Sequence, residues 1–201
     1  MHKKKIIFAT KNNGKLKEIQ AVLSDTFEVI SMNDAGLNID VDENGTTFEE
    51  NALKKAAEIM RISGEIVLAD DSGLEIDYLD KAPGVYSARY MGENTPYSIK
   101  NNKILEILKN VPEEKRTARF VCVIAASLPS PYNKTLTARG TIEGIIGYEI
   151  KGENGFGYDP IFYLPEKKLT TAQLSLTDKN KISHRGKALH IMKNKLIEIF
   201  K

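Results

Sequence analysis

Two adjacent carboxylates, Asp70 and Asp71, follow the apolar run IVL in the stretch ADDSG. Burying a carboxylate is costly unless a positive charge meets it, and hard divalent cations such as Mg²⁺ prefer carboxylate oxygens. Because side chains alternate along a strand, only one of the two should face a site. The stretch indicates a metal site, although a tight turn in which one carboxylate caps backbone amides would explain it as well.

A short polar loop, TKNNGK, connects an apolar run to a helical pattern between Thr10 and Lys15. A strand that leads into a helix presents unpaired backbone N–H groups, which can hold an anion. Asn12 and Asn13 tolerate left-handed turns, Gly14 allows close approach of a ligand, and Lys15 adds a positive charge. The P-loop pattern G-x-x-x-x-G-K-[ST] is absent. An anion site and an ordinary strand-to-helix turn both remain open.

An acidic segment precedes the helical stretch TTFEENALKKA. Glu43 lies ahead of this stretch, and acids at a helix start ordinarily serve the helix dipole and the cap. Lys55 lies about one turn into the helix. It could reach an anion held by the same metal, or it could be solvated.

Two C-terminal stretches, GFGYDP at 155–160 and DKNKISHRGKA at 178–188, are rich in polar and aromatic groups. The first presents Phe156 between glycines, which suits stacking on a nucleobase. It is not a dinucleotide fingerprint, since a third glycine is missing. The second places His184 and Arg185 at a helix start. Together with the lysines and carboxylates, these groups predict a nucleotide with several phosphates as the ligand.

The elements that must position these groups follow from periodicity. Strands are expected at 5–10, 27–32, 65–79 with a break at Ser72-Gly73, 118–128 and 135–146. Helices are expected from about Lys15, over 44–64 with a Thr47/Glu50 capping box and a Gly64 stop, over 96–111, and over 183–200 with Ser183 as the cap. Their order predicts an α/β chain around a mixed sheet.

Length and composition favour one domain, or two lobes of one domain, over the 201 residues. The one cysteine, Cys122, lies in the apolar run FVCVIAA and is expected to be a buried thiol. A net charge of +2 argues against a general nucleic-acid coat. Neither a signal-peptide core nor an apolar run long enough for a membrane helix is apparent, so we expect a soluble, cytoplasmic protein without nucleic-acid or membrane partners.

Six stretches, FATKNNGKLKEI, TTFEENALKKA, LADDSGLEIDYL, APGVYSARY, GFGYDPIFY and SHRGKAL, occur in this order and carry a resemblance over nearly the whole chain. The sequence closely resembles the inosine triphosphate pyrophosphatase family. The resemblance implies a long mixed sheet with flanking helices, two lobes with a central active-site cleft, and a homodimer. It also implies Mg²⁺-dependent hydrolysis of ITP, dITP or XTP to the monophosphate and pyrophosphate, which clears deaminated purines from the nucleotide pool.

The resemblance also implies roles for individual residues. Glu43 and Asp71 would bind the metal, and Asp71 would be the catalytic base. The substrate contacts would be Thr10, Lys11, Asn12, Asn13, Gly14, Lys15, Lys55, Ser72, Phe156, Gly157, Tyr158, Asp159, Lys179, His184 and Arg185.

Chemistry at these residues is consistent with that activity. We expect water to attack the α-phosphorus, with Asp71 mainly placing the metal and the water, since a metal-bound carboxylate is a weak base. Arg185 donates only, so it would pair with the 6-oxo group of hypoxanthine or xanthine and not with the 6-amino group of adenine. Two alternatives stay open: a pyrophosphatase of related fold that acts on other nucleotides, and a nucleotide-binding module without turnover.

Overall fold

A computed structural model describes residues 3–201. Seven strands form a mixed sheet in the order β2-β1-β3-β4-β5-β6-β7, which confirms the predicted α/β class. β1 pairs in parallel with β2 and β3, whereas β6 is antiparallel to β5 and β7. The strands are β1 (Lys5–Ala9), β2 (Glu28–Ser31), β3 (Val67–Ile76), β4 (Thr117–Leu128), β5 (Lys134–Ile146), β6 (Phe162–Leu164) and β7 (Leu169–Thr170).

Five α-helices accompany the strands in the described chain, with short 3-10 turns between them. They are α1 (Asn13–Leu23), α2 (Phe48–Ser63), α3 (Tyr97–Ile107), α4 (Leu176–Ile182) and α5 (His184–Phe200). Within residues 3–201, none of the helices combines the length and the apolar character needed to cross a membrane.

The chain divides into two compact units. The first unit comprises residues 3–71, 122–140 and 184–201, and the second comprises 72–121 and 141–183. β3, β4 and β5 each contribute residues to both units, because the division falls within these three strands.

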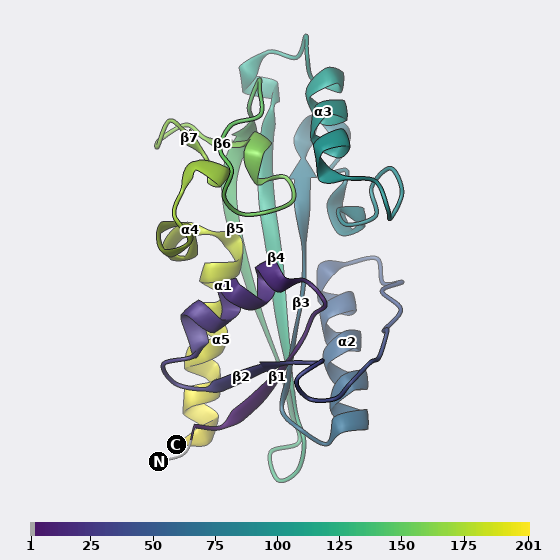
Figure 1. The fold of residues 1–201 in the computed structure, drawn as a ribbon, viewed down its shortest axis with the longest axis vertical. Coiled ribbons are helices and arrows are strands. Elements are labelled where there is room, and N and C mark those ends of the chain that lie inside the picture. Colours follow the sequence, from purple (N-terminus) through teal and green to yellow (C-terminus); the bar gives the residue numbers. More distant parts are fainter. Residues whose placement is uncertain (1–2) are drawn as a thin grey trace. The chain divides into compact units, whose positions relative to one another are not determined.

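The first unit is built around β1 and the N-terminal part of β3. α1 and α5 pack against each other on one side of these strands, and α2 lies on the other side (Figure 1). The first and last predicted helices bury apolar residues here, including Ile19 and Leu23 of α1 and Leu189 and Met192 of α5. Cys122 is buried in the same core as a free thiol, as predicted.

The second unit has its own apolar core, which contains Leu74, Ile104, Phe120 and Phe162. The rings of Phe120 and Phe162 lie 4.5 Å apart. This core backs the segment 156–159, because Tyr158 is one of its buried members.

The boundaries of α2 agree with the sequence-based prediction. Thr47 and Glu50 form the predicted capping box, and Gly64 ends the helix in a left-handed conformation with φ of 69°. α1 begins at Asn13 with Asn12 as its cap, which is earlier than the predicted start near Lys15. The short elements α4, β6 and β7 were not predicted.

The predicted break at Ser72-Gly73 is wrong, since β3 runs without interruption from Val67 to Ile76. A glycine in a strand interior weakens the strand but does not end it when neighbouring strands supply pairing. Asp70 and Asp71 therefore lie inside a strand, not in a turn after it, and the turn explanation for this pair no longer applies.

Gly140 in β5 allows α5 to approach closely. A Cβ at this position would collide with the carbonyl oxygen of His184 and would lie 2.7 Å from the amide nitrogen of Ala188, both of which are backbone atoms. We expect Gly140→Ala to lower the free energy of unfolding by about 2 kcal/mol or more, the range of overpacked cores, in a urea titration.

The matched control is Gly147→Ala, where an added Cβ would make only ordinary contacts, at 3.6 Å from the nearest atoms. Equal stability of the two variants would contradict the assignment of Gly140 as a close-approach position.

Candidate active site

The carboxylate of Asp70 is fully buried and lies between two cationic side chains of the first unit. Nζ of Lys15 in α1 lies 3.1 Å from both carboxylate oxygens. Arg185 in α5 donates to Oδ2 from Nη2 at 3.1 Å and from Nε at 3.3 Å. Burial by itself would raise the pKa of Asp70, but Lys15, Arg185 and Lys55 hold the pKa of this carboxyl well below its usual range. Asp70 is therefore a buried, ionised group.

The guanidinium of Arg185 connects three elements. Besides Asp70 in β3, its Nη1 donates to the buried carboxylate of Glu18 in α1. Desolvation would lower the pKa of Arg185, and the charges of Asp70 and Glu18 raise it overall. Arg185 therefore stays charged although it is 1% exposed. His184, the first residue of α5, is also buried.

Asp71 has different surroundings from its neighbour. Its Oδ2 accepts a hydrogen bond from Nδ2 of Asn51 in α2 at 2.9 Å. Burial raises the pKa of Asp71 to about 6, with the charge of Glu43 adding to this effect and the Asn51 hydrogen bond and Lys15 opposing it. The carboxylate of Asp70 thus pairs with side chains of α1 and α5, whereas that of Asp71 pairs with a side chain of α2, as alternation along a strand requires. That only one of the two faces a substrate site stays a prediction.

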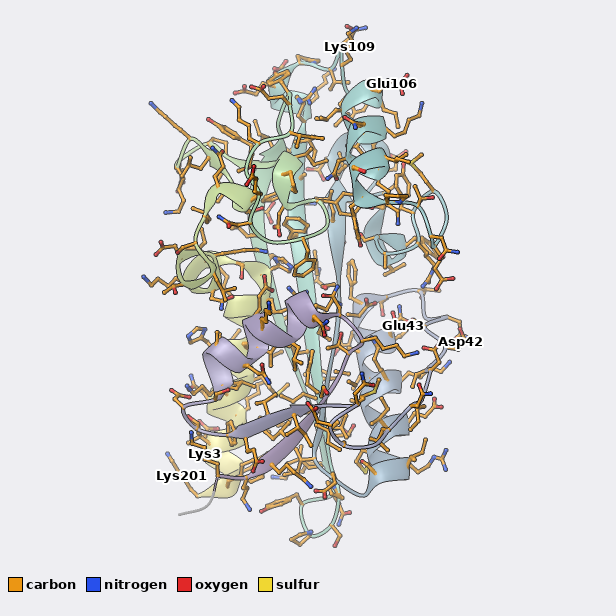
Figure 2. The ribbon with its side chains drawn as sticks, viewed as in Figure 1. Lys3, Asp42, Glu43, Glu106, Lys109 and Lys201 are labelled. Carbon is orange, nitrogen blue, oxygen red and sulfur yellow. The ribbon has the colours of Figure 1, made fainter. Side chains whose placement is uncertain are left out.

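Glu43 and Lys55 form an ion pair in the first unit. Glu43 lies in the segment that precedes α2 (Figure 2). Nζ of Lys55 also donates to the backbone oxygen of Asp70 at 3.0 Å. Burial would lower the pKa of Lys55, but the charges of Glu43 and Asp70 raise it overall. Lys55 is thus directed at the acidic cluster and is not a solvated side chain.

The loop from Thr10 to Lys15 is ordered by its own side chains. Oγ1 of Thr10 accepts from the amide of Asn12 at 3.0 Å, and Oδ1 of Asn12 accepts from the amide of Lys15 at 3.1 Å. Asn13 and Gly14 form the first turn of α1. Lys11 makes an exposed ion pair with Asp40. The loop is therefore a capped helix start whose Lys15 side chain reaches the buried Asp70.

The acidic residues suit a cation that also binds the substrate. Within residues 3–201, no group of three or more His, Cys, Asp or Glu side chains could hold a metal ion. Mg²⁺ in phosphate-processing sites is commonly held by one or two carboxylates together with waters and substrate phosphates. Glu43 and Asp71 are near enough for the charge of one to raise the pKa of the other. Because a nearby cation would relieve this repulsion, the two carboxylates fit such an ion.

In the second unit, Asp159 orders the segment that carries Phe156. Its Oδ2 accepts from the amide of Phe156 at 2.9 Å and from Nζ of Lys179 at 2.6 Å, and its Oδ1 accepts from Oγ1 of Thr171 at 2.8 Å. Nζ of Lys179 also lies 5.0 Å from the centre of the Phe156 ring. Asp159 is 2% exposed. Its contacts give it a structural task in addition to any substrate contact.

Helix α3 supports the same segment of the second unit. Nδ2 of Asn101 donates to the carbonyl oxygen of Gly157 at 3.1 Å. The rings of Tyr97 and Tyr158 meet edge to face at 5.2 Å, and the hydroxyl of Tyr158 donates to the backbone of Ser87 at 2.9 Å. The buried Tyr158 is therefore part of the support of the loop.

The predicted residues are divided between the two compact units. The set in the first unit is Thr10, Lys11, Asn12, Asn13, Gly14, Lys15, Glu43, Lys55, Asp71, His184 and Arg185, and the set in the second unit is Ser72, Phe156, Gly157, Tyr158, Asp159 and Lys179. Ser72 is half-buried in β3.

Partners of these residues that were not predicted include Glu18, Asn51 and Thr171. Glu18 and Asn51 each interrupt the apolar face of a helix, and such a polar residue on a buried face is a usable sequence signal. Thr171 has no comparable signal, because its role depends on the loop that Asp159 forms. Asp70 was considered with Asp71 but was not assigned a role.

The charge cluster around Asp70 generates a stability prediction. We expect Asp70→Asn to lower the free energy of unfolding by about 3 kcal/mol, since it leaves Lys15 and the buried Arg185 with one partner fewer. Chemical denaturation monitored by circular dichroism measures this change.

Asp40→Asn is the matched control, because Asp40 pairs with Lys11 at the surface. We expect it to change the free energy of unfolding by less than about 1 kcal/mol. A result in which both variants match the wild-type protein would show that the buried cluster contributes nothing to stability.

Known proteins resemble this chain over nearly its whole length. A curated dITP/XTP pyrophosphatase of Clostridium perfringens is 49% identical over 205 aligned residues, which cover 98% of this chain and 100% of the relative. The dITP/XTP pyrophosphatase of Exiguobacterium sibiricum is 52% identical over 186 residues, covering 92% and 93%.

Solved structures agree with these sequence relatives. The Ham1 protein of Staphylococcus aureus aligns with a TM-score of 0.85 at 42% identity, covering 97% of this chain and 99% of its own. The nucleoside-triphosphatase / dITP/XTP pyrophosphatase of Mycobacterium abscessus aligns with a TM-score of 0.72 at 37% identity, covering 94% and 98%. The sequence model of the Ham1 family matches residues 6–195. This chain therefore belongs to the Ham1 family.

Proposed function

We propose that this protein hydrolyses dITP, ITP and XTP to the monophosphate and pyrophosphate in a Mg²⁺-dependent reaction. Relatives named dITP/XTP pyrophosphatase, which align with 92–98% of the chain, support the substrate class. The observation that carries the chemistry is the cluster of the first unit, in which Lys15 pairs with the Asp70 carboxylate and Lys55 pairs with the Glu43 carboxylate and donates to the backbone oxygen of Asp70, next to Asp71.

The basic groups of this cluster suit a triphosphate. Lys15 lies in the first turn of α1, where backbone N–H groups and the helix dipole favour an anion. Lys55 is held near Asp70 and Glu43 and keeps its charge. We infer that both lysines bind phosphate oxygens and offset the negative charge that develops during phosphoryl transfer.

The carboxylates of Glu43 and Asp71 would hold the divalent cation. When bound, Mg²⁺ would acidify a coordinated water and offset charge on the phosphates. Asp71 receives its orientation from Asn51, which suits a carboxylate that must place a cation and a water at defined positions. We infer that placement is the main task of Asp71 and that proton transfer is secondary.

The base is assigned to Phe156, whose segment is ordered by Asp159 and Lys179. A flat ring on an ordered loop suits stacking on a purine. Reading of the 6-oxo group by Arg185 stays a prediction. Because Arg185 also pairs with Asp70 and Glu18, a variant at Arg185 would change base contacts and the buried cluster together. The predicted homodimer and cytoplasmic location likewise stay predictions.

Product analysis tests the proposed activity directly. The purified protein is incubated with ITP, dITP, XTP, GTP and ATP, with Mg²⁺ and with excess chelator, and the products are separated by ion-exchange chromatography. We expect the monophosphate and pyrophosphate from ITP, dITP and XTP, and no turnover after chelation. The 6-oxo acceptor of hypoxanthine and xanthine separates them from adenine, which carries a 6-amino donor, whereas guanine shares the 6-oxo group and would have to be rejected at its 2-amino group.

Release of single phosphates would contradict the reaction type, and equal turnover of ATP and GTP would contradict the substrate class. Nucleotide binding without any turnover would support the binding-module alternative.

Phe156 provides a test of base stacking. We expect Phe156→Ala to raise KM for ITP by about 10-fold or more, because stacking of a base on an aromatic ring contributes roughly 1–3 kcal/mol. Steady-state kinetics over a range of ITP concentrations measures the change.

Phe156→Tyr is the matched variant, since it keeps a flat ring at the same position, and it should retain most of the affinity. Similar KM values for the alanine variant and the wild-type enzyme would remove Phe156 from the base site.

A further inference from the structure

Asn51 is a buried polar side chain on the apolar face of α2. It is 1% exposed, and its neighbours on this face include Phe48 and Ala52. An amide buried among apolar groups is costly unless its donors and acceptors are satisfied. The helix does not need Asn51 for its cap, because Thr47 and Glu50 already form the capping box. A reason for Asn51 must come from its contacts.

Both ends of the Asn51 amide are engaged within the first unit. Nδ2 donates to Oδ2 of Asp71 at 2.9 Å, and Oδ1 accepts from the backbone amide of Gly45 at 2.8 Å. A carboxylate only accepts and a backbone N–H only donates, so the two partners determine the orientation of the amide. Asn51 thus joins the strand that carries Asp71 to the segment that precedes α2.

Close packing makes the contact with Gly45 specific. A Cβ at Gly45 would lie 2.7 Å from Oδ1 of Asn51 and 2.9 Å from Cβ of Glu50. Glu50 accepts from the amides of Thr46 and Thr47, so the same segment is also held next to Gly45. Only a glycine allows the backbone to approach Asn51 this closely.

The segment held by Asn51 is the one that carries Glu43. Glu43 lies two residues before Gly45 and pairs with Lys55, which lies one helical turn beyond Asn51 in α2. One face of α2 therefore contacts this segment at two points and contacts Asp71 at a third.

We propose that Asn51 is a positioning residue that fixes the Asp71 carboxylate and the segment carrying Glu43 relative to each other, so that both carboxylates can bind the same divalent cation. This inference rests on the proposed function, because the cation belongs to it. Removing a residue that hydrogen-bonds to a metal ligand and orients it commonly lowers metal affinity or activity 10- to 100-fold.

The experiment uses the full-length protein and four variants. Binding of Mn²⁺ without nucleotide is measured by electron paramagnetic resonance, exchange of the Gly45 amide proton by NMR, and kcat and KM for ITP by steady-state kinetics. The variants are Asn51→Ala, Asn51→Asp, Gly45→Ala and, as a control, Asn194→Asp on the exposed side of α5.

Removing both ends of the amide should affect both partners. We expect Asn51→Ala to weaken Mn²⁺ binding about 10-fold or more, the usual effect of removing a hydrogen-bond partner of a metal ligand. We also expect it to accelerate exchange of the Gly45 amide proton. We expect kcat to fall more than KM rises, because a positioning residue does not touch the nucleotide. The Asn194→Asp control should match the wild-type protein in all three measurements.

Asn51→Asp separates the two ends of the side chain. The carboxylate still accepts from the Gly45 amide, so slow exchange of this amide should persist, whereas a carboxylate oxygen now faces Oδ2 of Asp71 and kcat should fall. Gly45→Ala displaces the segment from the other side, and we expect it to weaken Mn²⁺ binding and lower kcat.

Folded Asn51→Ala protein with the Mn²⁺ affinity and Gly45 exchange of the wild type would overturn the proposal. Should this variant fail to fold, Asn51→Asp and Gly45→Ala decide, and wild-type kcat in both would overturn it. If the wild-type protein does not hydrolyse nucleotides, the proposed function fails. The positioning role is then still decided by Mn²⁺ binding and amide exchange in Asn51→Ala and Gly45→Ala.

Discussion

The buried carboxylate of Asp70 imposes the main constraint on the first unit. A charge without solvent must be met by opposite charge, and Lys15 of α1 and Arg185 of α5 meet it at hydrogen-bonding distances. Arg185 in turn requires Glu18, its second carboxylate partner. Two helices that are distant in the sequence are therefore tied to one residue of β3.

The neighbouring Asp71 shows how a strand gives two identical side chains different chemistry. Asp70 faces cations and its pKa is lowered, whereas Asp71 faces α2 and burial raises its pKa to about 6. The alternation of side chains along β3 produces this separation. A group whose charged form is destabilised by burial is well suited to gain from a cation, which is why we assign placement of the ion to Asp71 and structural support to Asp70.

In the second unit, too, a buried carboxylate holds the neighbouring groups in place. Asp159 accepts from the amide of Phe156, the ammonium group of Lys179 and the hydroxyl of Thr171, so one buried carboxylate orders the loop that carries the half-buried Phe156. Gly155 is required beside it, since its φ is 74° and a side chain would collide with the Asp159 carboxylate. In both units, the groups proposed to contact the nucleotide are thus supported by buried carboxylates.

The sequence by itself determined the α/β class, the presence of α1 and α5, and both ends of α2, because these depend on periodicity and on local capping chemistry. It also predicted site residues, through their resemblance to a known family. Only the tertiary structure decided that β3 continues through Ser72, that Asp70 and Asp71 face different helices, and that Arg185, Glu18, Asn51 and Thr171 hold carboxylates in place. These features depend on partners far away in the chain, and local sequence patterns carry no information about which distant residue will satisfy a buried charge.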